Sequence, residues 1–310
     1  MEFKHISVML DEVLEYLDIK SDGVYVDGTL GGAGHSSEIL RRLKTGMLIG
    51  IDKDGDAIEA SSKRLSAISS NFTIVKDDFK NFRNILDRLS VEKVDGVLLD
   101  LGVSSYQLDN SERGFSYRFD SKLDMRMNRD QGLSAYEVVN NYSEEKLVKI
   151  LYDYGEERFA KRIVANIIAE RQKAPIETTG QLVKLIENAY PKKLLYAGGS
   201  VAKQTFQAIR IEVNGELDRL KEVLYDIVDR LNKGGRLCVI TFHSLEDRIV
   251  KNVFKDLATE CICPPSAIIC VCNHKARVKT LTKKPITASE EELKNNKRSQ
   301  SAKLRVVSKL

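Results

Sequence analysis

The hydrophobic residues in the first hundred positions form short runs that alternate with helical patterns. The runs occupy 24–26, 47–51, 72–75 and 94–99. Between them, apolar residues recur every three or four positions, as Ile39, Leu40 and Leu43 do after the first run. Four apolar runs separated by helices are typical of a parallel sheet with helical crossovers. The pattern therefore predicts an α/β fold.

The strand-like pattern disappears between 110 and 213, where apolar residues follow helical spacing instead. Leu147, Ile150 and Leu151 share one helical face behind Ser143, a predicted N-cap that two glutamates follow. Similar stripes predict helices around 159–167 and 182–189, and Pro191 is expected to end the second of these. We therefore predict an all-helical domain over 110–213.

The sheet pattern resumes after this helical stretch. Apolar residues from 217 to 231 predict a helix that Gly234 and Gly235 end, and 237–242 predicts a fifth strand. A helix is expected after Ser244. Near the end, Ser289 and Glu292 have capping-box spacing, and 304–307 predicts a closing strand. The sequence thus predicts one α/β domain, built from 1–109 and 214–310, which the helical domain interrupts.

Charge is unevenly distributed along the 310 residues. The whole chain carries a net charge of +4, yet 275–310 holds eleven Lys or Arg and three Glu. This basic C-terminal tail predicts contact with a polyanion, nucleic acid first, although a solvated surface is the alternative. No apolar run reaches the roughly 18 residues of a membrane helix, and the first five residues lack the features of a secretory signal. We expect a cytoplasmic protein that does not contact a membrane.

A glycine-rich segment, VDGTLGGAGH at 26–35, joins the first predicted strand to the first predicted helix. In this context glycines let the backbone approach a ligand closely. The dinucleotide fingerprint would place a third glycine at position 37, where this chain has Ser37. The carboxylate of Asp27 suits a cationic sulfonium and amino group better than an anionic pyrophosphate. The segment therefore favours a methyl donor over a nicotinamide cofactor.

Acidic and aromatic residues follow the other predicted strands. Asp52 ends the second strand, where a carboxylate can accept both ribose hydroxyls of an adenosine cofactor. Phe79 follows the third strand and would either stack on adenine or belong to the core. Asp100 ends the fourth strand, and Gln107 comes soon after it. Open α/β sheets bind ligands at these carboxyl ends, so the residues predict an adenosine site there.

Eight segments spread over nearly the whole chain resemble the RsmH, or MraW, family. They are DGTLGGAGHS (27–36), LLDLGVSS (98–105), ERGFS (112–116), LDMRM (123–127), YGEERFAKRI (154–163), TFQAIRIEVNGEL (205–217), ITFHSLEDRIVK (240–251) and RSQSAKLRV (298–306). The resemblance implies a Rossmann-like methyltransferase sheet with an inserted helical domain for substrate recognition. It also implies methyl transfer from S-adenosylmethionine to N4 of one cytidine in the decoding centre of bacterial 16S ribosomal RNA.

The resemblance further implies which residues bind the cofactor. These are Ala33, Gly34, His35, Asp52, Phe79, Asp100 and Gln107. Two alternatives remain open from the residues themselves. One is an RNA-binding ribosome-assembly protein that retains a cofactor fold, and the other is a nicotinamide-dependent dehydrogenase.

Two residues are candidates for catalysis. The N4 amine of cytosine is a poor nucleophile because its lone pair is conjugated with the ring, so an enzyme must orient it and accept its protons. Asp100 would accept a hydrogen bond from the amine or serve the cofactor alone. His243, after the fifth predicted strand, would take the proton or merely bind its neighbours. The Pro-Pro-aromatic residues of amino-methyltransferases that act on DNA are absent after Asp100.

Small-subunit ribosomal RNA, or the small ribosomal subunit, is the expected partner. A target base within folded RNA must be extruded into the pocket. Basic residues of the helical domain and of the C-terminal tail are expected to contact phosphates. The candidates are Lys192, Lys193, Lys203, Lys297, Arg298, Lys303 and Arg305.

Four cysteines form two close pairs, Cys261 with Cys263 and Cys270 with Cys272. Four soft ligands would suit zinc, although structural zinc sites usually separate the members of a pair by two or more residues. The alternative is small buried cysteines in a proline-containing loop. We assign no catalytic metal from the sequence.

Overall fold

The computed structural model describes residues 7–195, 200–264 and 269–310. The chain folds into two compact units. The sheet unit comprises Met1–Gly102 and Leu217–Leu310, and the helical unit comprises Val103–Glu216. The helical unit extends several residues beyond 110–213 at both ends.

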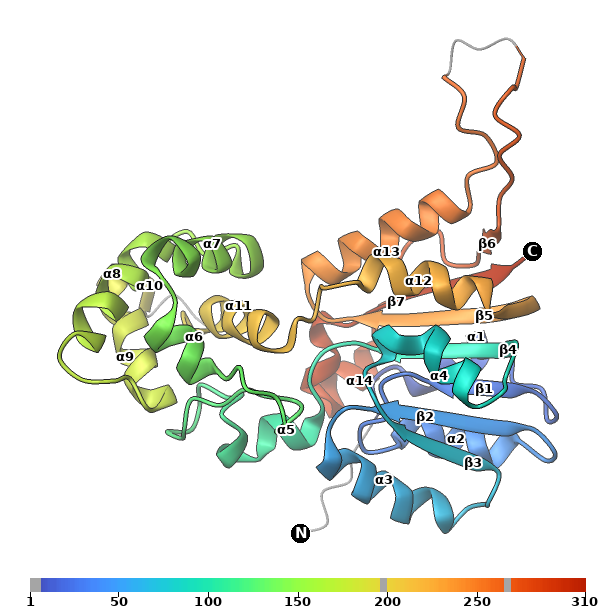
Figure 1. Cartoon of the computed structure of the whole chain (residues 1–310), viewed down its shortest axis with the longest axis horizontal. Coiled ribbons are helices and arrows are strands. Elements are labelled where there is room, and N and C mark those ends of the chain that lie inside the picture. The colour runs from blue at the N-terminus through green and yellow to red at the C-terminus, as the bar shows by residue number, and fades with distance from the viewer. Residues whose placement is uncertain (1–6, 196–199, 265–268) are drawn as a thin grey trace. The chain divides into compact units, whose positions relative to one another are not determined.

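A seven-stranded sheet forms the centre of the sheet unit (Figure 1). Its strand order is β3-β2-β1-β4-β5-β7-β6, in which β1 to β5 run parallel and β7 runs antiparallel to both β5 and β6. The strands are β1 (Val24–Asp27), β2 (Met47–Asp52), β3 (Phe72–Lys76), β4 (Val94–Asp100), β5 (Leu231–Thr241), β6 (Val278–Thr280) and β7 (Lys303–Lys309). The α/β prediction with a parallel sheet is confirmed.

Helices cover both faces of this sheet, because successive side chains of each strand point to opposite faces. In β4, Val97 and Leu99 belong to one buried cluster and Leu98 belongs to another. The first cluster includes α4 (Phe82–Arg88), α12 (Leu220–Asp229) and α13 (Ser244–Leu257). The second includes α1 (Leu10–Leu17), α2 (Gly34–Arg42) and α3 (Gly55–Ser66). Strands buried on both faces read as continuous apolar runs, which explains the sequence pattern.

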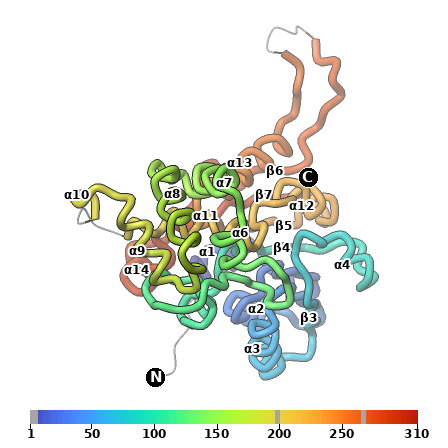
Figure 2. Tube along the Cα trace, turned by 60° about the vertical axis from the view of Figure 1, so that its left-hand side comes forward, coloured from blue at the N-terminus to red at the C-terminus, as the bar shows by residue number. Residues whose placement is uncertain are grey.

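The described residues of the helical unit contain helices and no strand. The segment is inserted between β4 and β5, as predicted. Ser143 caps its helix by accepting a hydrogen bond from the Lys146 N–H, and the helix before Pro191 ends at Ala189. The elements are α5 (Ser105–Asp109), η2 (Ser111–Arg113), α6 (Ala135–Asn141), α7 (Glu144–Gly155), α8 (Ala160–Arg171), α9 (Thr179–Ala189), α10 (Lys192–Leu195) and α11 (Lys203–Asn214). Figure 2 follows the same path from another side.

The start of β5 corrects one sequence prediction. Helix α12 ends at Asp229, and Gly234 and Gly235 lie inside β5 rather than after a helix. Gly234 has a φ of 80°, and a Cβ on Gly235 would lie 2.8 Å from the Asn232 carbonyl oxygen. The register against β4 shifts at this point. The two glycines therefore build a strand irregularity instead of a helix end.

The C-terminal segment is folded into the sheet unit. Strand β7 lies between β5 and β6, and it is preceded by α14 (Glu290–Asn295) and η3 (Lys297–Ser301). The expected basic tail therefore contributes β6, α14, η3 and β7 to the sheet unit. Only half of the predicted capping box forms: the Ser289 hydroxyl accepts from the Glu292 N–H, while the Glu292 carboxylate accepts from the Met9 N–H at 2.9 Å. No helix in the described ranges is long and apolar enough to cross a membrane.

Candidate functional site

The order of strands reverses between β1 and β4. From β1 the chain proceeds to β2 and β3 on one side, and from β4 it proceeds to β5 on the other. The segments that leave these two strands are bound together, since the Gly28 N–H donates to the Leu98 carbonyl at 2.9 Å and the Asp100 N–H donates to Thr29 Oγ1 at 2.6 Å. Open α/β sheets bind ligands in the crevice at such a reversal. The residues predicted at the carboxyl ends therefore meet where ligand binding is expected.

The glycine-rich segment turns sharply between β1 and α2. Gly31 and Ala33 both have positive φ, at 49° and 56°, and Ala33 is the residue before α2. The buried Asp27 carboxylate holds the segment from inside, accepting from the Thr29 N–H at 3.1 Å and the Ser36 hydroxyl at 2.7 Å. Burial raises the pKa of Asp27. Asp27 thus fixes the conformation of the glycine-rich segment. This structural role adds to the attraction of a cationic ligand that the sequence predicted.

Asp52 connects the same segment to the end of β2. Its Oδ2 accepts from the Gly31 N–H at 2.7 Å, and its Oδ1 accepts from the Asp54 N–H at 2.9 Å. Burial raises the pKa of this carboxyl to about 6 despite these two hydrogen bonds. Each oxygen of a carboxylate can accept a second hydrogen bond. Asp52 is therefore positioned by the backbone and still able to accept two hydroxyl groups.

The carboxyl group of Asp100, at the end of β4, is strongly perturbed. Its Oδ1 atom is buried and has no hydrogen-bond partner among the described residues. Burial, followed by the negative charges of Asp27 and Glu246, raises the pKa of Asp100 to about 8. Its Oδ2 lies 3.8 Å from Nδ1 of His35. A buried acceptor without a partner indicates a place where a ligand donates a hydrogen bond.

His35 lies in the first turn of α2 and is buried. Its Nε2 lies 2.9 Å from the Val8 carbonyl oxygen. A carbonyl oxygen only accepts hydrogen bonds, so Nε2 must carry the proton and donate it. Burial lowers the pKa of His35 to about 4, so the ring is neutral near pH 7. Nδ1 then presents a lone pair toward Asp100. Ala33, Gly34 and His35 thus reach the site together, at the start of one helix.

Phe79 begins η1 (Phe79–Asn81), separated from the end of β3 by two residues, and packs partly against the core of the sheet unit. A Cβ on Gly28 would lie 3.3 Å from the Phe79 Cβ. The ring is therefore held beside the glycine-rich segment, which allows both functions that the sequence left open.

His243 directly precedes α13, as the predicted strand-to-helix position requires. Its Nε2 lies 3.1 Å from Glu246 Oε1, and both side chains are nearly inaccessible to solvent. Glu246 also accepts from the Phe242 N–H at 3.0 Å. Sequence reasoning missed Glu246, although its place three residues after His243 in a new helix was an available signal.

Gln107 belongs to the helical unit. It forms a capping box with Ser104 at the start of α5: the Ser104 N–H donates to Gln107 Oε1 at 3.0 Å, and the Gln107 N–H donates to Ser104 Oγ at 3.2 Å. The side chain is buried. Gln107 therefore has a local structural role in α5, and its expected role toward the cofactor stays a prediction.

The basic residues expected to contact RNA differ in exposure. Lys192, Lys193 and Lys203 of the helical unit are exposed, as are Lys297 and Arg298 of the sheet unit. Arg305 contradicts the prediction, because its guanidinium is buried and donates twice to Asp247, at 2.7 and 3.1 Å. Lys303 is partly exposed and lies 3.6 Å from the same carboxylate. Arg305 is thus part of an internal ion pair.

Comparison with known proteins identifies the family. The model of the MraW methylase family matches residues 2–310. Proteins named ribosomal RNA small subunit methyltransferase H are similar to this chain over its full length: one from Clostridium botulinum strain 657 is 57% identical over 100% of both chains, and one from Clostridioides difficile is 54% identical over 100% of both. A third, from Agathobacter rectalis, is 55% identical over 100% of this chain and 99% of that protein. The chain belongs to the MraW methylase family.

Proposed function

We propose that this protein transfers a methyl group from S-adenosylmethionine to N4 of a cytidine in 16S ribosomal RNA. The observation that carries the proposal is the cluster of hydrogen-bond acceptors at the reversal of strand order, within a chain whose full-length relatives are named ribosomal RNA small subunit methyltransferase H. The cluster consists of the carboxyl groups of Asp27, Asp52, Asp100 and Glu246, and of Nδ1 of His35. We call it the acceptor cluster.

The acceptor cluster fits a cationic ligand. Burial raises the pKa values of Asp27, Asp52 and Asp100, and repulsion from neighbouring carboxylates adds to the shifts of Asp52 and Asp100. A positive charge nearby would therefore stabilise the ionised form of these groups. The same carboxylates would repel an anionic pyrophosphate. This difference favours S-adenosylmethionine over a nicotinamide dinucleotide.

The cofactor residues have distinct tasks in this proposal. Asp52 accepts the two ribose hydroxyls, Phe79 lies against the adenine, and the backbone at Ala33 and Gly34 allows close approach of the methionine portion. Asp100 and His35 accept hydrogen bonds from the amino group, and the role of Gln107 toward the cofactor stays a prediction. When bound, S-adenosylmethionine supplies a methyl group activated by its sulfonium charge.

Catalysis requires the acceptor amine to be held with its lone pair toward the methyl carbon. We assign Asp100 mainly to the cofactor, with its unpartnered Oδ1 available to accept an N–H of the cytosine amine. His243 is the proposed group beside the amine that takes the proton lost after transfer, and the Glu246 carboxylate, 3.1 Å from its Nε2, would stabilise the charged imidazolium that results. Near exclusion of solvent from both side chains strengthens such contacts.

RNA binding would use the exposed lysines of the helical unit, together with Lys297 and Arg298 of the sheet unit. The helical unit is thereby proposed as the substrate-recognition domain. The small-subunit RNA is recognised either free or assembled with protein. Because N4 of a paired cytidine is engaged in base pairing, its base must leave the helix for the reaction.

Labelled S-adenosylmethionine tests the reaction directly. The protein is incubated with naked 16S RNA and, separately, with small subunits. Part of the RNA is digested to nucleosides to identify the labelled base, and part is cut with a base-specific ribonuclease to locate the labelled fragment, both by mass spectrometry. The proposal predicts label in N4-methylcytidine at a single position. Label in adenosine or in protein would contradict it, and the substrate that accepts label identifies the state of the RNA that is recognised.

A further inference from the structure

An arm in the sheet unit carries four of the five cysteines and lies outside the candidate site. It leaves α13 after Leu257 and returns to β6 at Val278, and Figure 1 shows it as two elongated segments that project beyond α13. Its base is closed by a hydrogen bond from the Arg277 N–H to the Leu257 carbonyl at 2.7 Å. The described residues of the arm form neither helix nor strand before β6. Helix or sheet hydrogen bonds therefore do not hold these described residues in place.

Apolar burial does not hold the described residues of the arm in place either. Ile262, Ile269 and Val271 are 61%, 75% and 79% exposed. Cys261 and Cys270 are exposed, and Cys263 and Cys272 are partly exposed, so the alternative of small buried cysteines is wrong. A long loop without secondary structure usually needs another constraint to adopt one conformation.

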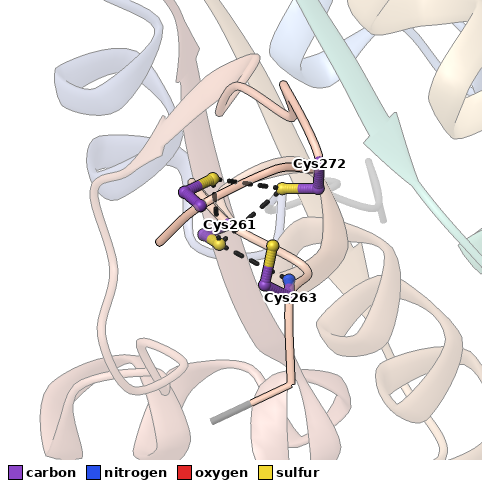
Figure 3. A group of neighbouring side chains, drawn as sticks. Cys261, Cys263 and Cys272 are labelled. Atoms are coloured by element: carbon purple, nitrogen blue, oxygen red, sulfur yellow. Dashed lines mark hydrogen bonds between the residues drawn. The ribbon is translucent and has the colours of Figure 1, made fainter. Parts of the chain in front are cut away.

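The four sulfur atoms converge at one point of the arm (Figure 3). The sulfur of Cys261 lies 3.5 Å from that of Cys270 and 3.7 Å from that of Cys272, and the latter two are 3.5 Å apart. The Cys263 sulfur lies within 4.8 Å of the others. In a tetrahedral site with Zn–S distances of about 2.3 Å, the sulfur atoms are about 3.8 Å apart. The observed separations therefore match one zinc ion shared by four thiolates.

The short spacing within each pair follows from the elongated backbone. Side chains two positions apart lie on the same side of an extended chain, so one intervening residue suffices where a tight turn needs two. The intervening residues, Ile262 and Val271, are then expected on the opposite side, which agrees with their exposure. On an extended backbone, a pair of cysteines separated by one residue can therefore bind the same zinc ion.

Backbone N–H groups also point at the sulfurs. The Cys263 N–H donates to the Cys261 sulfur and the Val271 N–H donates to the Cys263 sulfur, each at 3.4 Å. The Cys272 sulfur accepts from the N–H groups of Ile262 and His274. Such donors stabilise anionic thiolates, the form that binds metal. We propose that Cys261, Cys263, Cys270 and Cys272 bind one structural zinc ion that holds the two described segments of the arm together.

Metal analysis of the full chain tests this proposal. The protein is purified, treated with a chelator under reducing conditions, reloaded with Zn²⁺ alone and dialysed, and its zinc content is measured by mass spectrometry. We expect about one zinc ion per chain, and tetrahedral thiolate absorption bands after replacement by Co²⁺. The double variant Cys261→Ser/Cys272→Ser should lose the metal and the bands.

The fifth cysteine provides the matched control. Cys238 is buried in β5, where burial raises the pKa of its thiol, so Cys238→Ala should keep the full zinc content. Because the cysteines of the arm lie outside the buried clusters, Cys261→Ser/Cys272→Ser should retain the circular dichroism of the wild type. A second double variant, Cys263→Ser/Cys270→Ser, should likewise lose the zinc and keep the fold. Retained zinc in both double variants, bound iron in place of zinc, disulfides in the protein as purified, or free thiols without metal would each overturn the proposal.

Discussion

The carboxylate Oδ2 of Asp100 lies 3.8 Å from Nδ1 of His35, and the other ring nitrogen of His35 lies 2.9 Å from the Val8 carbonyl. The carbonyl requires the proton on Nε2, so Nδ1 is an acceptor. The pKa of His35 is lowered to about 4 and that of Asp100 is raised to about 8, so both groups are mainly neutral at pH 7 without ligand. Without ligand the protonated Asp100 carboxyl is itself the donor that faces Nδ1. Once Asp100 is ionised, both atoms are acceptors and need a shared donor, which the ammonium group of the methyl donor would supply.

The affinity for S-adenosylmethionine should depend on pH through Asp100. Below pH 8 a cationic ligand must displace the proton of Asp100, at a cost of up to about tenfold in affinity per pH unit. Asp100→Asn has no such proton, so the ratio of its dissociation constant to that of the wild type should grow from pH 6 to pH 8. Calorimetric titration measures both. The amino group of the ligand titrates equally in both proteins, and a ratio that stays constant would contradict the assignment.

Asp100→Asn should stabilise the ligand-free protein at neutral pH. The folded-state pKa is raised above that of an unfolded aspartate, so the folded state holds a proton that the unfolded state has lost. The free energy of unfolding of the wild type therefore falls as pH rises from about 4 to about 8. Thermal unfolding at pH 7.5 should show a midpoint higher by a few degrees in the variant. The difference should vanish near pH 4, and a variant that is less stable at every pH would contradict this expectation.

Replacing Asp52 should weaken cofactor binding strongly. Asp52→Ala removes the proposed acceptor of two hydroxyls and the acceptor of the Gly31 N–H, and hydrogen bonds to charged groups contribute about 1.5–3 kcal/mol each. We expect the dissociation constant for S-adenosylmethionine to rise at least roughly tenfold. Asp56→Ala, which alters a carboxylate in the first turn of α3, is the control and should bind normally. Equal affinities of wild type and Asp52→Ala would exclude the ribose role.

The exposed lysines of the helical unit should bind RNA by contacting its phosphates. Lys192→Gln/Lys193→Gln should weaken RNA binding and make the slope of log affinity against log salt shallower by about 1 to 2. The control pair is Lys93→Gln/Lys233→Gln, which removes the same charge near the amino ends of β4 and β5, away from the carboxyl ends of the strands. Filter binding across a salt series compares them. Identical slopes in the two variants would show that Lys192 and Lys193 do not contact phosphates. The affinity for S-adenosylmethionine should be unchanged in both variants.

Burial on both faces made β1 to β4 predictable, because their apolar runs reflect the two helical layers. Strand β6 has only three residues, of which Lys279 is exposed, so no apolar run marks it. The glycines at 234 and 235 permit a helix end and a strand irregularity equally well. Their outcome depends on pairing with β4, which is remote in the sequence.

The acidic residues of the candidate site were predictable because strand order determines which strand ends meet. The ion pair of Arg305 with Asp247 was not, since it joins residues of β7 and α13 that are 58 positions apart. The pKa shifts of Asp100 and His35 were equally inaccessible, because they arise from burial and from neighbours on other elements.

Equilibrium binding to two cofactors tests most directly the claim that the acceptor cluster holds a cationic methyl donor. Calorimetric titration of the wild type at pH 8 compares S-adenosylmethionine with a nicotinamide dinucleotide. The acceptor cluster predicts saturable binding of S-adenosylmethionine and no binding of the dinucleotide. Both Asp52→Ala and Asp100→Asn should bind S-adenosylmethionine more weakly than the wild type does. Tight binding of the dinucleotide without binding of S-adenosylmethionine would contradict the account.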